Sequence, residues 1–140
     1  MIDGQAFEKL RCHILMEHDE LRAAIAKVIS AADPARLAVA TNALLDRLTE
    51  HLAYEERALE PVLRAIDAWG PERARRMRED HRAQRVEIAK LREELATAPT
   101  GGLGRPVRPF VDELLADMAV EERDVLSLLR DDAVTVELGG

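Results

Sequence analysis

The stretch His51–Leu63, which reads HLAYEERALEPVL, carries an imidazole and a carboxylate four residues apart within an otherwise apolar helical pattern. Residues at i and i+4 lie one above the other on a helix, so His51 and Glu55 point to the same side. Pro61 follows late in this stretch and is expected to kink the helix, because proline cannot donate a backbone hydrogen bond. The stretch therefore predicts a helix that directs two polar groups toward the core.

A similar stretch recurs later in the chain, from Asp117 to Leu129, as DMAVEERDVLSLL. Aligned without gaps, Glu121 corresponds to Glu55 and Asp117 corresponds to His51. A repeated pair of ligand-type side chains at helical spacing indicates that two helices contribute to one site.

The composition favours a small helical protein without disulfides. The 140 residues suit one domain, 47% of them are hydrophobic and only 3% are aromatic, so an aliphatic core is expected. The net charge of −7 argues against nucleic acid and anionic membranes as partners. No apolar run reaches about 18 residues and the first ten residues resemble no signal peptide, so we predict a cytoplasmic protein. Cys12, the single cysteine, fits a reducing compartment.

Apolar residues spaced by three and four predict an all-α protein with four amphipathic helices. We expect them at residues 3–31, from 34 to the Trp69-Gly70-Pro71 break, at 71–96, and from 107 onward. Short connections favour an up-down-up-down antiparallel four-helix bundle over residues 1–130, with an irregular tail at 131–140. The expected face of the fourth helix comprises Phe110, Leu114, Asp117 or its neighbour Met118, Glu121, Val125 and Leu128.

Polar residues interrupt the apolar face of each predicted helix. His18 fills the gap between Ile14 and Leu21, and His81 lies in register with the apolar face of the third helix. Counting residues from each turn, at about 1.5 Å per residue, places all the interruptions near one level of the bundle. The candidate metal ligands are His18, His51, Glu55, His81, Asp117 and Glu121.

Several buried carboxylates are costly unless a positive charge compensates them. Protonated imidazoles could do so, but a metal ion also takes up the imidazole lone pairs. A mixed imidazole and carboxylate set favours a pair of iron or manganese ions, with zinc as a further candidate. Taken singly, each signal has an ordinary structural explanation, since one core histidine is usually just packed and one i,i+4 pair can simply stabilise a helix. The convergence of six residues favours metal binding.

The order of these motifs resembles the hemerythrin-like HHE cation-binding domain. The resemblance covers about residues 7–130 and is carried by EHDELR, HLAYEE with its trailing Pro61, REDHRAQ, and the later Glu121-Glu122 pair. It implies a non-haem di-iron centre inside a four-helix bundle, with two carboxylates and an oxo or hydroxo group bridging the irons. On this resemblance His18, His51 and His81 would be terminal ligands, and Glu55 and Glu121 would be the bridges.

The sequence departs from the family pattern at two places. Asp117 stands where the family usually has a histidine, and His81 is alone on its helix where oxygen carriers have two histidines, with Met77 one turn before and Arg85 one turn after. Carboxylate-rich ligands stabilise ferric iron, which disfavours reversible oxygen carriage, and the lost histidine leaves a coordination position open. Whether two metals, one or none are bound stays open at this point.

Three functions are therefore considered. The first is a binding module that senses or handles O2, NO or iron, and we favour it. The second is a redox enzyme of the same fold that reduces NO or peroxide or oxidises ferrous iron. The third is a degenerate, metal-free helical interaction protein. The sequence does not separate the first two, because the chemistry would belong to the metal.

Overall fold

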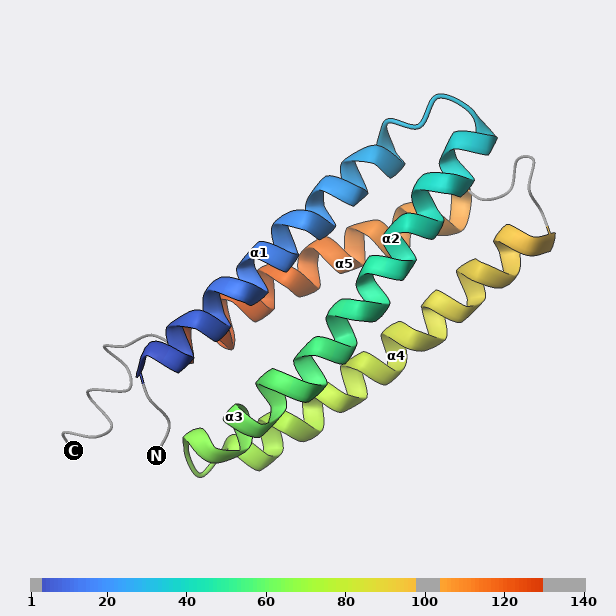
Figure 1. Ribbon diagram of the computed structural model, residues 1–140. Helices are drawn as coiled ribbons and strands as arrows, with labels where there is room; N and C mark the ends of the chain where they lie inside the picture. The colour runs from blue at the N-terminus through green and yellow to red at the C-terminus, as the bar shows by residue number, and fades with distance from the viewer. Residues whose placement is uncertain (1–3, 98–103, 130–140) are drawn as a thin grey trace.

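The computed structural model describes residues 4–97 and 104–129. The elements in chain order are α1 (Gly4–Ile29), α2 (Pro34–Tyr54), the π-helix η1 (Glu55–Leu59), α3 (Glu60–Ile66), α4 (Gly70–Thr97), α5 (Gly104–Asp124) and the 3₁₀-helix η2 (Leu126–Leu129). Because α2, η1 and α3 continue one another, the described chain forms four antiparallel rods (Figure 1). The predicted all-helical bundle is confirmed. The predicted tail at 131–140 lies outside the described residues.

Local capping explains two of the helix ends. Asp33 accepts a hydrogen bond of 2.8 Å from the Arg36 backbone N–H and Pro34 occupies the first turn, as an N-terminal cap requires. α3 ends at Ile66, three residues before the expected break, because Asp67 turns the chain by accepting from the Trp69 N–H at 2.9 Å. The turn is tight, since a Cβ on Gly70 would lie 2.1 Å from the Leu63 carbonyl oxygen.

The irregularity expected at Pro61 takes the form of the π-helix η1. The Glu60 N–H bonds to the Glu55 carbonyl, five residues back, directly before the proline. In a regular helix, residues four apart differ by about 40° in direction, so a series of them drifts around the helix axis. The π-turn has more residues per turn and offsets this drift. Glu55, Leu59 and Leu63 consequently all face the core, whereas Val62 and Ile66 are only half-buried.

The core consists of two apolar clusters separated by a polar level. One cluster occupies the half of the bundle that contains Leu21, Leu44 and Leu91, and the other contains Ile14, Leu59 and Leu129. Along each rod a polar residue marks the boundary between them: His18 in α1, His51 and Glu55 in α2 and η1, His81 in α4, Glu121 in α5. The expected single level of polar interruptions is therefore present.

The expected apolar face of α5 is confirmed at Leu114 and at Met118, the alternative to Asp117, and is wrong at Phe110 and Asp117. The buried residues are Val107, Val111, Leu114 and Met118, while Phe110 is half-buried and Asp117 is exposed. The helix also begins at Gly104 rather than near 107, because Pro106 is tolerated in a first turn. Among the described residues no helix is both long enough and apolar enough to cross a membrane.

Candidate metal centre

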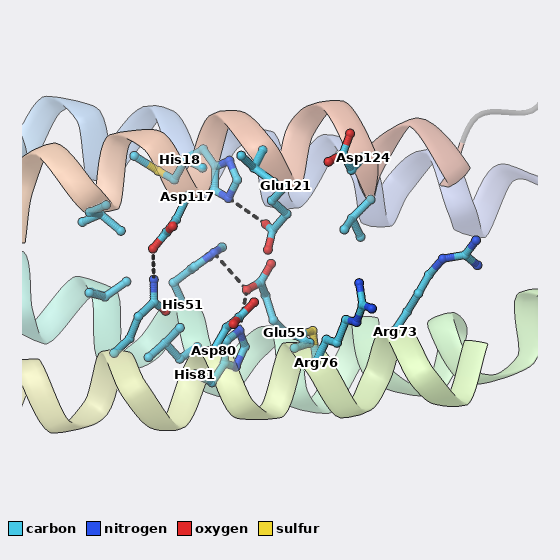
Figure 2. Close-up of a pocket in the computed structure, with 18 of the residues that line it drawn as sticks. His18, His51, Glu55, Arg73, Arg76, Asp80, His81, Asp117, Glu121 and Asp124 are labelled. Atoms are coloured by element: carbon cyan, nitrogen blue, oxygen red, sulfur yellow. Dashed lines mark hydrogen bonds and ion pairs between the residues drawn. The ribbon is translucent and has the colours of Figure 1, made fainter. Parts of the chain in front are cut away.

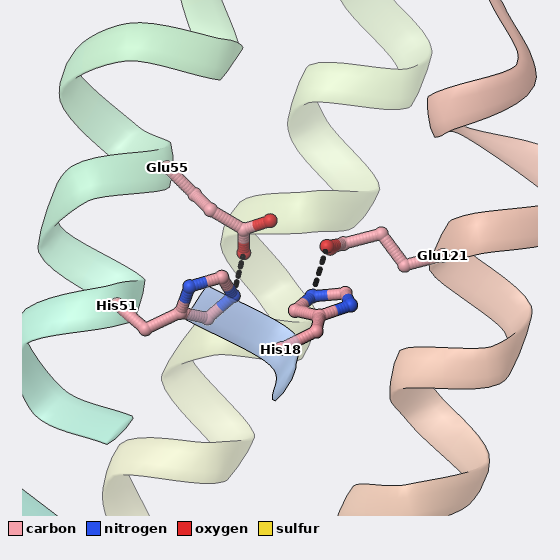
Figure 3. A group of neighbouring side chains, drawn as sticks. All are labelled: His18, His51, Glu55 and Glu121. Carbon is pink, nitrogen blue, oxygen red and sulfur yellow. Dashed lines mark ion pairs between the residues drawn. The ribbon is translucent and has the colours of Figure 1, made fainter. Parts of the chain in front are cut away.

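Four side chains from three of the rods converge at the polar level. One ligand-type atom from each of His18, His51, Glu55 and Glu121 lies within 4.8 Å of the corresponding atoms of the other three (Figure 3). His18 comes from α1, His51 and Glu55 come from α2 and the start of η1, and Glu121 comes from α5. The two histidines and Glu55 are at most 5% exposed, so the group lies inside the bundle.

His81 adds a side chain from α4, the one rod that contributes none of these four residues. Its Nε2 lies 3.1 Å from Glu55 Oε1, and the same oxygen lies 3.4 Å from His51 Nε2. His18 Nε2 lies 2.9 Å from Glu121 Oε1. All three imidazoles therefore direct Nε2 inward toward the two carboxylates (Figure 2). We call His18, His51, His81, Glu55 and Glu121 the ligand group.

Asp117 does not join the ligand group. Its side chain is exposed, and its Oδ2 accepts a hydrogen bond of 3.3 Å from Gln84 Nε2 across the gap between α5 and α4. Met118, its neighbour, takes the buried position instead, and Met77 is likewise buried in the apolar core. Gln84 is thus linked to Asp117 rather than to a buried ligand.

Each imidazole is held from outside by a further carboxylate. Nδ1 of His18 lies 2.7 Å from Glu122, Nδ1 of His51 lies 2.7 Å from Glu17, and Nδ1 of His81 lies 2.9 Å from Glu56. A carboxylate can only accept, so each Nδ1 donates and each neutral ring keeps the Nε2 lone pair on the inner side. Outer carboxylates of this kind orient metal-bound histidines and raise their basicity.

A positively charged or titratable group at the surface completes each of these contacts. Arg22 donates to Glu122 at 2.7 Å, Arg85 donates to Glu56 at 2.8 Å, and His13 Nε2 lies 3.2 Å from Glu17. Arg85, with a contribution from His81, lowers the pKa of Glu56 to about 2. We refer to the resulting chains, each running from a buried histidine to the surface, as the Glu122 arm, the Glu17 arm and the Glu56 arm.

The sequence analysis assigned no role to Glu17, and it included Glu56 and Glu122 only as members of the motifs HLAYEE and Glu121-Glu122. A signal for them exists, because each stands next to a member of the ligand group: Glu17 precedes His18, Glu56 follows Glu55 and Glu122 follows Glu121. The alignment of the two repeated stretches also pairs Glu56 with Glu122. Position on the helix could not reveal their histidine partners, which lie on neighbouring helices.

The two inner carboxyl groups are electrostatically inequivalent. Burial, and then the negative charge of Glu121, raises the pKa of Glu55 well above its usual value. Burial acts in the same direction on Glu121, but its close contacts with His18 and Glu55 outweigh burial and lower its pKa to about 2. Burial lowers the pKa of His51, whereas at His18 the carboxylates of Glu121 and Glu122 overcome burial and raise it. A cation bound beside Glu55 and Glu121 would compensate both carboxylates.

The donor set fits a metal ion. Glu55 Oε2 is buried without a hydrogen-bond partner among the described residues, and Glu121 Oε1 lacks one despite its proximity to His18. Buried polar atoms of this kind are rare and call for an explanation such as an absent ion. Three imidazole nitrogens and two carboxylates from all four rods are donors of the kinds that bundle cores use to hold metal ions.

A cavity of about 370 Å³ adjoins the ligand group (Figure 2). Apolar side chains such as Leu48, Leu52 and Met118 form part of its wall, and Glu55, His51 and the other members of the ligand group line it as well. The site therefore has room for a small molecule beside the ligand atoms.

The comparisons with known proteins agree with this geometry. The family model described as the hemerythrin HHE cation-binding domain matches residues 13–129, which include the whole ligand group and the three arms. No curated protein and no solved structure matched the chain. The family match over most of the chain and the buried His/Glu group together lead to one conclusion: this protein belongs to the hemerythrin HHE cation-binding domain family.

Proposed function

We propose that the ligand group holds a pair of non-haem iron ions and that this centre binds or senses a small diatomic molecule, O2 or NO, or iron itself. The observation that carries the proposal is the buried Glu55 carboxyl group, which faces Glu121, contacts two imidazoles and leaves Oε2 without a partner. Such a group is costly in a protein core unless a cation compensates it. A bound metal pair would supply redox chemistry and an affinity for diatomic ligands.

The distribution of donors favours two ions over one. Glu55 lies between the His51 and His81 imidazoles, and Glu121 lies beside His18. On this proposal His51, His81 and His18 are terminal ligands and the two carboxylates span the ions. Mixed nitrogen and oxygen donors suit iron, and manganese or zinc would be accepted by the same set with different chemistry.

A free coordination position favours binding of a small molecule. Asp117, expected as a sixth ligand, is exposed and hydrogen-bonded to Gln84, so the side of the site that faces α4 and α5 has fewer protein donors. The adjoining cavity lies on this side. The chain's own contribution is to orient the imidazoles through Glu17, Glu56 and Glu122 and to limit the solvent around the centre.

The proposal is tested by anaerobic reconstitution of chelator-treated protein with Fe²⁺, followed by addition of O2 or NO in separate experiments. We expect a new near-ultraviolet or visible absorption band that saturates with the gas. Glu55→Ala should abolish the band, and Glu50→Gln, which removes an exposed carboxylate one residue from His51, should leave it intact. Wild-type protein that binds iron but gives no spectral change with either gas would contradict the binding role.

A redox enzyme of the same fold is the second candidate, and the cavity beside the ligand group is the observation that favours it. The two functions differ in turnover. A sensor reacts once per centre and stops, whereas an enzyme consumes NO, peroxide or Fe²⁺ in large excess over its own concentration. Measurement of substrate consumed per chain with an electron donor present therefore distinguishes them.

A further inference from the structure

Three of the four gaps between neighbouring rods are bridged at the level of the ligand group. The Glu122 arm joins α1 to α5, the Glu17 arm joins α2 to α1, and the Glu56 arm joins α4 to η1. The Glu122 and Glu56 arms end in ion pairs with Arg22 and Arg85, and the Glu17 arm ends in a contact with His13. These outer contacts and the buried imidazoles close three sides of the site.

The fourth gap, between α4 and α5, is different. Among the hydrogen bonds and ion pairs of the described residues, only the 3.3 Å contact from Gln84 to Asp117 crosses it. The cavity beside the ligand group reaches the surface here, since all its exposed lining residues come from these two helices: Arg76, Asp80, Asp117, Val120 and Asp124. The site is therefore accessible from this side.

The rim of this opening carries more negative than positive charge, because Arg76, a basic residue on the rim, is already paired with Glu72. Asp80 and Asp117 are exposed, and within the described part of the chain neither forms an ion pair with a basic residue. Both also line a second, adjacent hollow of about 250 Å³ together with Glu113. In contrast, Asp124 on the same rim is paired with Arg123 at 2.8 Å.

A second observation lies at the floor of the same cavity. The Glu55 side chain is 1% exposed and its Oε2 has no hydrogen-bond partner among the described residues. One cavity thus connects two exposed carboxylates at its rim with an unpartnered carboxylate oxygen at its floor. Carboxylate oxygens at both ends provide a sequence of ligands suited to a hard or borderline cation.

We propose that divalent cations reach the ligand group through the gap between α4 and α5, docking first on Asp80 and Asp117 and then transferring past Gln84 to Glu55. This inference rests on the proposed metal centre. It adds the path by which cations enter the centre and the residues on that path that attract them. The basic lining residues Arg73 and Arg76 are paired with Asp67 and Glu72, so Asp80 and Asp117 leave an excess of negative charge in the cleft. Such an excess raises the local concentration of cations, and the effect decreases with ionic strength. On this proposal Asp117 acts during uptake and is not a ligand of the bound metal.

The test uses chelator-treated full-length protein and Co²⁺, whose visible absorption reports binding, in a stopped-flow instrument at low and high salt. The double variant Asp80→Asn/Asp117→Asn should slow uptake about three- to tenfold at low salt, within the range of electrostatic steering. Its final Co²⁺ content should equal that of the wild type. Gln84→Glu adds a carboxylate to the same rim and should accelerate uptake.

The matched control is Glu93→Gln/Asp112→Asn, which makes the same charge change on exposed residues of α4 and α5 that do not line the cavity. If the rim variant and the control have equal uptake rates, the access route is overturned while the metal centre stands. If the rim variant binds less Co²⁺ at saturation, Asp117 or Asp80 is a ligand and the route is again overturned. Wild-type protein that binds no Co²⁺ overturns both the route and the proposed function.

Discussion

At the scale of single residues, Glu55 shows most clearly that a group suited to metal binding lowers the stability of the metal-free protein. Its carboxyl group is 1% exposed, lies between two imidazoles and faces Glu121. Burial is the largest reason that its pKa is raised. For an acid whose pKa is higher in the folded protein than in the unfolded chain, folding stability decreases as the pH rises above the unfolded value of about 4.5.

Glu55→Gln should therefore stabilise the metal-free protein at neutral and alkaline pH. We expect a gain on the order of 1–3 kcal/mol in the free energy of unfolding at about pH 8. The gain should shrink toward pH 4.5 and vanish below it, where the carboxyl group becomes protonated in the unfolded chain as well. Urea denaturation of chelator-treated protein at both pH values measures it. If the variant were equally or less stable at pH 8, burial of the Glu55 carboxylate would not destabilise the metal-free protein.

The outer carboxylates should affect metal affinity without supplying a ligand. Glu56→Ala removes the partner of His81 Nδ1 and leaves Arg85 unpaired. Losing such an orienting contact typically lowers metal affinity by about 10- to 100-fold. Competition with a chelator of known affinity measures the change, and the absorption bands of the bound metal should persist. Glu79→Gln, on the exposed face of α4, is the control.

An unchanged affinity in Glu56→Ala would show that the hydrogen bond to His81 is incidental. The same reasoning applies to Glu122 with His18 and to Glu17 with His51. A variant that loses its bands altogether would instead indicate that the outer carboxylate is itself a ligand.

Periodicity located the buried histidines well because each replaces an apolar residue in a regular series. His18 stands between Ile14 and Leu21, and all three are buried. Periodicity did not decide whether Asp117 or Met118 is buried. Adjacent residues differ by about 100° around a helix, so a face shifted by one position exchanges Asp117 for Met118. Glu17 could not be assigned from the sequence, because its partner lies on another helix and only the packing of α1 against α2 brings them together.

At the scale of helices, Glu60 links α3 to α4. The side chain is 6% exposed and accepts from Arg78 at 2.6 Å and from Arg64 at 2.7 Å. Burial alone would raise its pKa, but the two guanidinium groups outweigh it and lower the value. A carboxyl group with a lowered folded pKa adds stability above the unfolded pKa and loses that contribution as the pH falls through the folded pKa.

Glu60→Gln should destabilise the protein at pH 7 by roughly 1–3 kcal/mol, because a buried charge-assisted contact is lost on both sides. The difference from the wild type should diminish as the pH is lowered below about 4.5. Denaturant unfolding across this pH range measures it, and metal affinity should be nearly unchanged.

The exposed pair of Glu79 with Arg75 provides the comparison for Glu60. Glu79→Gln should cost less than about 0.5 kcal/mol, because exposed ion pairs are screened by solvent. If Glu60→Gln were as mild as Glu79→Gln at pH 7, the contact between α3 and α4 would not depend on this carboxylate.

The spacing of apolar residues predicted the helices, but it did not predict the π-helical geometry of η1. The residues Glu55–Leu59 are ordinary helix formers, and a π-turn uses the same residue types as an α-turn. Pro61 signalled an irregularity nearby without specifying its form. The early end of α3 depends on Asp67, whose side chain finds the Trp69 N–H only once the turn is made.

At the scale of the whole molecule, the polar level divides the core into two apolar clusters and receives side chains from all four rods. A bound metal would tie these rods together. Since metal binds the folded protein in preference to the unfolded chain, saturation at about 100 times the dissociation constant should add about 2.7 kcal/mol of stability. Thermal unfolding with and without Fe²⁺ under anaerobic conditions measures this gain as a higher midpoint temperature.

The gain should disappear in Glu55→Ala, which lacks the carboxylate between His51 and His81. A wild-type midpoint that ignores both added metal and chelator would support a metal-free bundle. The bundle architecture itself would stand in that case, because both apolar clusters consist of residues outside the ligand group.

The most direct test of the metal pair is the iron content of protein reconstituted anaerobically with Fe²⁺ and then desalted. The ligand group predicts about two irons per chain. Glu55→Ala should retain close to none, and Glu50→Gln should match the wild type. Wild-type protein that retains no more iron than Glu55→Ala would contradict the proposal.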